Sequence, residues 1–371
     1  MADQINVLIV SSIDPLSALA EEITGLDPRL SVQDGTAGFL AELRSQGRTG
    51  PWVERLAAVV AQGRPVGSPP KTLDSLLAEA EIVYAMVLIP DHIRERAPKL
   101  RWIHIGNAGI EAFLSVGLVS PIGSGASTAR ADMTPKADIM LTNSRGVHAI
   151  GIAEHTMALI FALAKGIPRL LANQRSRRWE RFVTPELRHK VLGIVGLGAI
   201  GSEIAGLARG LGMRVIATKR SAVIRESDAS GINELFPPAD LRTMLAQSDF
   251  VVIAAPLTAE TKDMVSEPEL KSMKTTAYLI NVARGEIVNQ PALIKALAQG
   301  WIAGAGLDAF AIEPLPQESE LWELPNVILS PHMSGLTERR SDRLMGLFRE
   351  NLRRYLAGRE LLNLIDIDKG Y

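Results

Sequence analysis

The sequence predicts an α/β protein with two doubly wound parallel-sheet domains, and three observations support this prediction. Short apolar runs alternate with segments of helical periodicity along most of the chain, which is the pattern of βαβ units. A glycine-rich turn at residues 196–201 joins one such run to a helix. The chain also has 371 residues, of which 47% are hydrophobic, enough for two domains with full cores.

In the N-terminal half, the alternating pattern predicts strands at residues 5–12, 81–87 and 100–106 and helices at residues 16–26 and 72–80. Because such strands pair in parallel, we expect helices on both faces of their sheet. Two stretches interrupt the pattern. Residues 44–70 are rich in glycine and proline, and residues 120–137 are small and polar, so both are interpreted as surface excursions of the first domain.

The C-terminal half continues the pattern around a long helix. Residues 149–167 are apolar on nearly every helical face, so we expect this helix to be buried. A strand–turn–helix–strand unit follows, then four more strands and an arginine-rich amphipathic helix at about 337–357. The expected strands are residues 191–195, 214–218, 249–255, 276–283, 303–310 and 326–331.

The composition excludes several classes of protein. A net charge of −1 is atypical of a nucleic-acid-binding surface. The absence of cysteine excludes disulfides and thiolate chemistry, and no histidine pair has metal-ligand spacing, so we expect no catalytic metal. No apolar run reaches the roughly eighteen residues that a membrane span needs, and the N-terminus reads as a strand rather than a signal peptide. We therefore expect a cytoplasmic protein with no nucleic-acid or membrane partner.

The glycine-rich turn has the G-x-G-x-x-G spacing of a dinucleotide-binding site, and it lies between a strand and a helix as that motif requires. Gly196 allows the tight turn, Gly198 allows the backbone to approach a pyrophosphate, and Gly201 allows close packing of helix and strand. The helix N-terminus offers free N–H groups to the phosphates. The predicted cofactor contacts are Gly196, Leu197, Gly198, Ala199, Ile200 and Gly201.

The next strand ends in Lys219, Arg220 and Ser221, where a carboxylate that binds the ribose 2′-hydroxyl is expected. An arginine can hold a phosphate through its planar fork, and a lysine adds a point charge. This predicts a preference for NADP(H), with NAD as the alternative cofactor. A solvated Lys–Arg pair that binds nothing is the structural alternative.

Six segments match one enzyme family in order and spacing. They are TNSRGVHAIGIAEHTMALI, LRHKVLGIVGLGAIG, APLTAETKDMV, LINVARGEIVNQPAL, GLDAFAIEPLP and LWELPNVILSPHMSG. From about residue 100 to the end of the final helix, the chain resembles the D-isomer-specific 2-hydroxyacid dehydrogenases, in particular NADP-type glyoxylate/hydroxypyruvate reductases. Residues 1–99 agree with the family only in the alternation of predicted strands and helices.

The resemblance implies that Arg284, Glu313 and His332 form the catalytic set. The residue types suit reduction of a 2-oxoacid, because Arg284 can grip a carboxylate and polarise the adjacent carbonyl. His332 can donate a proton near neutral pH, and a carboxylate at Glu313 would orient its ring. Taken without the resemblance, the three residues also fit an interdomain ion pair, a solvent-facing glutamate and a histidine at a domain junction.

Further contacts are carried over from the family. A loop at residues 107–110 is expected to bind the substrate carboxylate through its backbone amides. The loop residues are Asn107, Ala108, Gly109 and Ile110. A second group of residues is expected to line the cofactor. These are Pro256, Thr261, Val282, Ala283, Asp308, Ser334 and Gly335.

These inferences combine into one expected organisation. A Rossmann dinucleotide-binding domain at 147–332 is inserted into a flavodoxin-like substrate-binding domain formed by 1–146 and 333–371. The chain is expected to reduce a 2-oxoacid to the D-alcohol with NADPH, with domain closure excluding water. The apolar helix near 151–165 predicts a homodimer, since it needs cover beyond its own domain. The alternatives are a formate- or phosphite-type dehydrogenase on this scaffold and a non-catalytic nucleotide-sensing corepressor.

Overall fold

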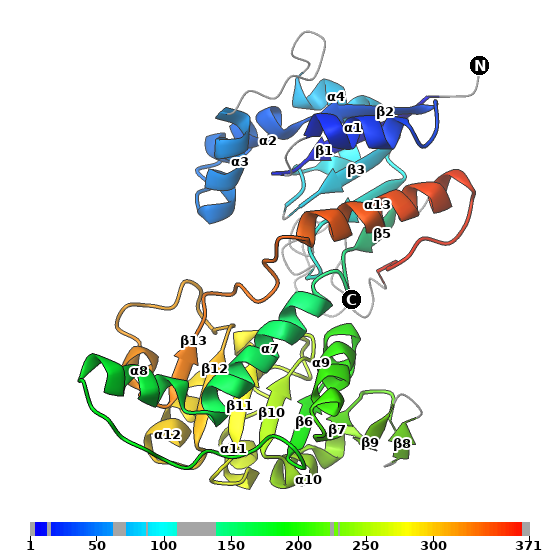
Figure 1. Ribbon diagram of the computed structural model, residues 1–371. Helices are drawn as coiled ribbons and strands as arrows, with labels where there is room; N and C mark the ends of the chain where they lie inside the picture. Colours follow the sequence, from blue (N-terminus) through cyan, green and yellow to red (C-terminus); the bar gives the residue numbers. More distant parts are fainter. Residues whose placement is uncertain are drawn as a thin grey trace, which may run out of the picture. The chain divides into compact units, whose positions relative to one another are not determined.

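A computed structural model describes residues 4–12, 16–61, 72–86, 88–109, 139–222, 226–228 and 231–365 (Figure 1). The chain forms two compact units. Unit 1 comprises Met1–Val147 with Arg339–Tyr371, and unit 2 comprises His148–Glu338. Each unit is built around one sheet. The assignment of unit 1 to the substrate and unit 2 to the dinucleotide stays a prediction.

Unit 1 contains a five-stranded parallel sheet in the order β2-β1-β3-β4-β5, which is the flavodoxin order. The strands are β1 (Ile5–Val10), β2 (Leu30–Asp34), β3 (Ile82–Ala85), β4 (Trp102–Ile105) and β5 (Met140–Asn143). The helices are α1 (Leu16–Thr24), α2 (Thr36–Ser45), α3 (Pro51–Ala61), α4 (Leu73–Glu79), α5 (Ile93–Arg96) and α13 (Arg340–Leu356). This sheet confirms the predicted fold class for the N-terminal half.

Successive residues of strand β3 pack on opposite faces of the unit 1 sheet. Tyr84 belongs to the apolar cluster that contains Phe348 of helix α13. Val83 belongs to the cluster that contains Leu56 of helix α3. Both faces of the sheet are therefore covered by helices, as a parallel sheet requires.

The prediction that residues 44–70 are a surface excursion is wrong for its first part. Residues 51–61 form helix α3, and Val53 and Leu56 are buried in the core. The glycines and prolines punctuate the ends of this segment, while its interior carries apolar residues at helical spacing. Residues 62–70 of this excursion and the whole of 120–137 lie outside the described residues.

Unit 2 contains an eight-stranded sheet in the order β13-β12-β11-β10-β6-β7-β9-β8. The strands are β6 (Val191–Val195), β7 (Arg214–Thr218), β8 (Glu226–Asp228), β9 (Ile232–Phe236), β10 (Phe250–Ile253), β11 (Tyr278–Asn281), β12 (Gly304–Leu307) and β13 (Val327–Leu329). Seven strands are parallel in the Rossmann order, extended by β13, and β8 pairs antiparallel with β9 at the edge. The second parallel sheet is thus confirmed, whereas β8 and β9 had no sequence-based prediction.

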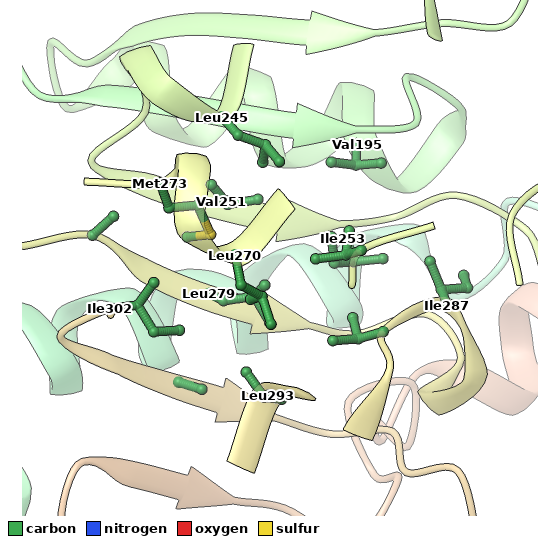
Figure 2. Packing of buried hydrophobic residues seen from close by; sticks show 14 of the residues in the cluster. Val195, Leu245, Val251, Ile253, Leu270, Met273, Leu279, Ile287, Leu293 and Ile302 are labelled. Carbon is green, nitrogen blue, oxygen red and sulfur yellow. The ribbon is translucent and has the colours of Figure 1, made fainter. Parts of the chain in front are cut away.

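The helices of unit 2 cover both faces of its sheet. They are α7 (Ala149–Ala164), α8 (Ile167–Arg175), α9 (Ala199–Gly210), α10 (Leu241–Gln247), α11 (Glu267–Ser272) and α12 (Gln290–Ala298), with short 3-10 turns at Pro238–Asp240, Gly285–Ile287 and Glu320–Glu323. Figure 2 shows one face, where Val251 and Leu279 of the strands contact Leu245, Leu270 and Leu293 of α10, α11 and α12. Helices α7 and α9 cover the other face, with Ile160 and Ile204 fully buried.

Helix α7 is largely buried, as predicted, although Ile150 and Phe161 stay exposed. Its continuation, α8, has no buried residue and exposes Ile167, Leu170 and Leu171. In the described part of the chain, no single helix has the length and apolar character of a membrane span. The pair α7 and α8, bent by 60°, meets that criterion only when the two are taken together.

Candidate active site

The glycine-rich turn joins strand β6 to helix α9 in unit 2. Gly196 has φ 98°, a left-handed conformation that favours glycine, and a Cβ there would lie 2.7 Å from the backbone of Ala255. A Cβ at Gly201 would collide with the Gly196 carbonyl oxygen. At Gly198, the N-cap of α9, a Cβ would meet nothing within 4 Å. Two glycines therefore serve packing, and Gly198 leaves open space at the helix N-terminus. A contact of this turn with the cofactor pyrophosphate stays a prediction.

Strand β7 holds this turn in place at its carboxyl end. The Thr218 carbonyl accepts hydrogen bonds from the amides of Gly196 and Leu197, both at 3.2 Å. Lys219, Arg220 and Ser221 follow at once and are exposed. The predicted cations Lys219 and Arg220 thus lie one and two residues beyond Thr218, the buried residue that anchors the glycine-rich turn.

The loop after strand β10 forms a second wall near these cations. The Thr258 hydroxyl donates a hydrogen bond to the Glu260 carboxylate and holds the Glu260 pKa below its ordinary value, and the Arg220 charge contributes in the same direction. Thr261 closes its own turn: its hydroxyl donates to the Pro256 carbonyl at 2.7 Å and accepts from the Thr258 amide at 2.7 Å. A contact of Pro256 or Thr261 with the cofactor stays a prediction.

Arg284 lies three residues beyond strand β11, in a backbone segment that Asn281 fixes. The Asn281 side chain accepts a hydrogen bond from the Ala283 amide at 3.1 Å and donates one to the Arg284 carbonyl at 3.0 Å. A Cβ at the next residue, Gly285, would collide with the backbone of Phe310. The chain leaving β11 therefore packs directly on the chain leaving β12. Sequence reasoning missed Asn281, although its place at a strand end is a recognisable signal. Val282 and Ala283 are buried beside it, and their contact with the cofactor stays a prediction.

Glu313 and His332 come from the loops after strands β12 and β13, and they form a pair. The His332 Nδ1 lies 2.8 Å from a Glu313 carboxylate oxygen, and the other oxygen accepts a hydrogen bond from the Phe310 amide at 3.0 Å. Because Glu313 occupies Nδ1, the His332 Nε2 is the ring nitrogen that can exchange a proton with a substrate. His332 also has φ 49°, a strained conformation for a non-glycine residue that is typical of functional sites.

The interaction between Glu313 and His332 shifts the pKa values of both side chains. The hydrogen bond to Glu313 raises the pKa of His332 above its ordinary 6.5, while burial and the Arg284 charge oppose that rise. Burial raises the pKa of Glu313, but the hydrogen bonds from His332 and the Phe310 amide outweigh it, so the net pKa lies below 4.5. The three predicted catalytic residues follow the neighbouring parallel strands β11, β12 and β13, so they lie at the same carboxyl edge of the sheet. The Arg284 charge acts on the pKa values of both Glu313 and His332.

Asp308 holds the loop that carries His332. Its carboxylate is 1% exposed and accepts hydrogen bonds from the Ser330 hydroxyl at 2.5 Å and from the amides of Met333 and Ser334 at 2.9 and 3.0 Å. His155 of helix α7 contacts the same Ser330 hydroxyl at 3.0 Å. Asp308 thus positions the His332 loop. Contacts of Asp308, Ser334 and Gly335 with the cofactor stay predictions.

The predicted carboxylate-binding loop lies in unit 1, directly after strand β4. The Ala108 carbonyl accepts a hydrogen bond from the Asn143 side chain at 2.8 Å, and the Asn107 carbonyl accepts one from the Ser144 amide at 3.0 Å. These bonds anchor the loop to the end of β5, and Gly109 follows them. Ile110 lies outside the described residues. Among the residues that the structure describes, no cluster of three potential metal ligands occurs.

Comparisons with known proteins agree with this arrangement. Residues 157–334 match the family model described as D-isomer specific 2-hydroxyacid dehydrogenase, NAD binding domain. The glyoxylate reductase of Thermococcus litoralis is 39% identical over 63% of this chain and 72% of its own. That of Pyrococcus furiosus is 35% identical over 77% of this chain and 83% of its own.

A solved structure supports the same relationship over the full length. The D-isomer specific 2-hydroxyacid dehydrogenase of Xanthobacter autotrophicus, solved in complex with NADPH and MES, has a TM-score of 0.73. It is 26% identical and covers 99% of this chain and 100% of its own. The predicted resemblance is confirmed. The chain belongs to the D-isomer specific 2-hydroxyacid dehydrogenase family and is an NAD(P)-dependent oxidoreductase.

Proposed function

We propose that the protein reduces a small 2-oxoacid, glyoxylate among them, to the corresponding D-2-hydroxyacid with NADPH. The observation that carries this proposal is the convergence of Arg284, Glu313 and His332 beyond three adjacent strands. The glyoxylate reductases of two archaea are relatives at 39% and 35% identity, which favours a short 2-oxoacid.

Each side chain has a defined task in this reaction. When bound, NADPH would supply the hydride that C2 of the 2-oxoacid accepts, and the turn at 196–201 is assigned to hold it. Arg284 binds the carboxylate and polarises the carbonyl oxygen, which gains negative charge as the reaction proceeds. His332 donates its proton from Nε2 to that oxygen, and Glu313 stabilises the charged ring before transfer. Asp308 keeps the His332 loop in position. The amides of the loop at 107–109 are assigned to the substrate carboxylate.

An assay of the purified protein with NADPH tests the proposal. Glyoxylate, hydroxypyruvate and phenylpyruvate are expected to support oxidation of NADPH, whereas formate and phosphite are not expected to reduce NADP. Turnover of formate or phosphite would favour the alternative dehydrogenase on this scaffold. Binding of NADPH without turnover of any 2-oxoacid would favour the corepressor alternative.

We further propose that Lys219, Arg220 and Ser221 bind the 2′-phosphate of NADP(H). The NADPH-bound relative of Xanthobacter autotrophicus supports this assignment, as does the exposure of all three residues. The double change Lys219→Ala with Arg220→Ala is expected to raise the KM for NADPH by roughly tenfold or more, since each charge-assisted contact contributes about 1.5–3 kcal/mol. The KM for NADH should stay within about twofold, since NADH lacks the 2′-phosphate.

Arg214→Ala is the matched control for this measurement. Arg214 lies at the opposite end of the same strand and pairs with Glu234 at 2.9 Å, so its loss should leave both KM values unchanged. Equal increases of KM for NADPH and NADH in the double variant would contradict the 2′-phosphate assignment. The two single variants would show which cation makes the larger contact.

We also propose that the chain forms a homodimer through the α7–α8 face. Ile167, Leu170 and Leu171 on α8 are 40–48% exposed, and Trp179 and Val183 beyond it are 92% and 99% exposed. Several large apolar side chains exposed within one short segment are typical of an interaction site. Sedimentation should give twice the chain mass for the unmodified protein and a lower mass for Leu170→Glu with Leu171→Glu. A monomer in the unmodified protein would contradict the proposal.

A further inference from the structure

A buried histidine of unit 1 lies in the strand that precedes the loop at 107–109. His104 belongs to β4, is 0% exposed, and pairs in register with Thr142 of β5. The rings of Tyr84 and Phe348 have their centres 5.5 and 5.2 Å from that of its imidazole. Burial lowers the pKa of His104 from 6.5 to about 3, so the ring is neutral at physiological pH. A neutral imidazole has one donor nitrogen and one acceptor nitrogen.

The hydrogen bonds of two hydroxyl groups determine which nitrogen of His104 carries the proton. The Ser144 hydroxyl donates its single hydrogen to the Ile105 carbonyl at 3.0 Å, and its oxygen lies 3.3 Å from the His104 Nε2. Nε2 is therefore the donor in that contact. Nδ1 is then an acceptor and receives the Thr142 hydroxyl proton at 2.8 Å, while the Thr142 oxygen accepts from the Trp102 indole at 2.8 Å. The bonds thus run in one direction, from the Trp102 indole to the Ser144 hydroxyl.

Ser144 connects this chain of hydrogen bonds to the loop that follows β4. Its hydroxyl donates to the carbonyl of Ile105, the last residue of β4, and its amide donates to the carbonyl of Asn107 at 3.0 Å. Ser144 therefore holds the main chain on both sides of Gly106. A Cβ at Gly106 would lie 2.7 Å from the Tyr84 hydroxyl oxygen, so the chain also packs closely on β3. The start of the loop is thus fixed by contacts with both neighbouring strands.

Two consecutive peptide units of this loop have the same orientation. The Asn107 carbonyl accepts its hydrogen bond from the Ser144 amide. The Ala108 carbonyl accepts one from the side chain of Asn143, the last residue of β5, at 2.8 Å. The N–H of a trans peptide unit points opposite to its C=O, so the N–H groups of Ala108 and Gly109 point away from β5. Two consecutive N–H groups on one side of a loop are suited to bind an anion.

We propose that His104 is a positioning residue for the substrate carboxylate. Its Nε2–H fixes the Ser144 hydroxyl, and Ser144 in turn holds the peptide unit that presents the Ala108 N–H. This inference rests on the proposed function, in which the loop at 107–109 binds the carboxylate. His104 takes no part in proton transfer, because it is fully buried and both of its ring nitrogens are bonded to hydroxyl groups.

Kinetics of two conservative variants with glyoxylate and NADPH test this inference. His104→Gln can place an amide N–H near the position of Nε2, whereas His104→Asn reaches only the position of Nδ1. His104→Asn should raise the KM for glyoxylate by roughly threefold to tenfold, as for loss of one hydrogen bond, with kcat within about twofold. His104→Gln should keep a KM close to that of the unmodified protein. Both variants remove the ring from the core, so a role in stability alone predicts that both raise KM.

Trp102→Phe is the matched control, because Trp102 is fully buried on the same strand and donates to Thr142, on the far side of the His104 ring from Ser144. It should lower the melting temperature and keep KM within about twofold. Ser144→Ala should raise KM as His104→Asn does, and the double variant should raise it no further, since both changes break the same contact. Ser144→Ala removes only a hydroxyl, so it keeps the test available if the His104 variants do not fold.

Amide hydrogen exchange, followed by NMR, gives a second readout that needs no substrate. The Ser144 N–H, which donates to Asn107, should exchange faster in His104→Asn than in His104→Gln. Equal KM values and equal exchange rates in these two variants would overturn the role of His104 and leave 2-oxoacid reduction intact. A KM that rises with the loss of melting temperature in every variant, Trp102→Phe included, would do the same. An unmodified protein that reduces no 2-oxoacid would instead overturn the proposed function.

Discussion

His332→Ala is expected to lower kcat for 2-oxoacid reduction by roughly 10²–10⁴-fold, the range contributed by a positioned general acid. The reason lies in the pairing of His332 with Glu313 at 2.8 Å, which leaves Nε2 as the donor for the developing alkoxide. The KD for NADPH, measured by fluorescence titration, should stay within about twofold, because the dinucleotide turn lies elsewhere in unit 2.

His189→Ala provides a closely matched control. His189 is exposed, belongs to the same unit and also has a left-handed backbone, with φ 66° against 49° for His332. The backbone consequence of replacing histidine by alanine is therefore similar in the two variants, and only His332→Ala should lose activity. Comparable kcat values for both variants would exclude His332 as the proton donor.

The same pair determines how activity depends on pH. Reduction needs protonated His332, and Glu313 raises the pKa of that ring. The kcat/KM for reduction should therefore stay constant at low pH and fall as pH rises through a value above 6.5. Glu313→Gln removes the largest cause of the raised pKa, so the fall should move to lower pH. A profile that does not move would show that another group limits the reaction.

The shifted pKa values of His332 and Glu313 also determine how the stability of the folded protein depends on pH. The raised pKa of His332 contributes stability below its ordinary pKa, and this contribution is lost as pH rises through the folded-state value. The lowered pKa of Glu313 contributes stability above its ordinary pKa, and this is lost as pH falls through the folded-state value. The pair therefore stabilises unit 2 most between these limits, and solvent screening keeps the effect small because both side chains are more than a third exposed.

Local signals in the sequence were sufficient for much of the fold. Strands β6, β10, β11 and β12 are short, strongly apolar and followed by small or polar residues, so their positions follow from periodicity alone. Helix α3 was missed because the prolines and glycines around it dominated the interpretation of residues 44–70. The edge strand β8 has only three residues, Glu226–Asp228, and its pairing with β9 is a tertiary property without a local pattern.

The site shows the same division between local and long-range information. The family resemblance identified Arg284, Glu313 and His332 as the catalytic set. These residues lie near one another because they follow neighbouring strands that end at one edge of the sheet. The hydrogen bonds that hold them were not predictable. Asp308 contacts residues 22 to 26 positions away, so its role in supporting the His332 loop depends on the fold.

Arg284→Ala is expected to lower kcat/KM for glyoxylate by roughly 10²–10³-fold, as for removal of a group that stabilises the developing oxyanion. KM should rise because the carboxylate loses its cation, and kcat should fall because the carbonyl loses its polarising group. Arg284→Lys should recover only part of the loss, since an ammonium group cannot reproduce the planar fork. Arg242→Ala, which breaks an ion pair with Glu269 on the α10–α11 side of the unit, should have no effect.

A second readout of Arg284→Ala does not depend on the rate. The Arg284 charge lowers the pKa of His332, so its removal should move the His332 titration to higher pH. Glu313→Gln should move the same titration in the opposite direction, and NMR of the His332 ring can follow both shifts in the absence of substrate. Opposite shifts of the His332 pKa would show that both Arg284 and Glu313 act electrostatically on His332. Arg284 would then act on the proton donor as well as on the substrate. If Arg284→Ala leaves the pKa of His332 unchanged, Arg284 has no electrostatic effect on the proton donor. Its assigned role would then be limited to binding the substrate carboxylate.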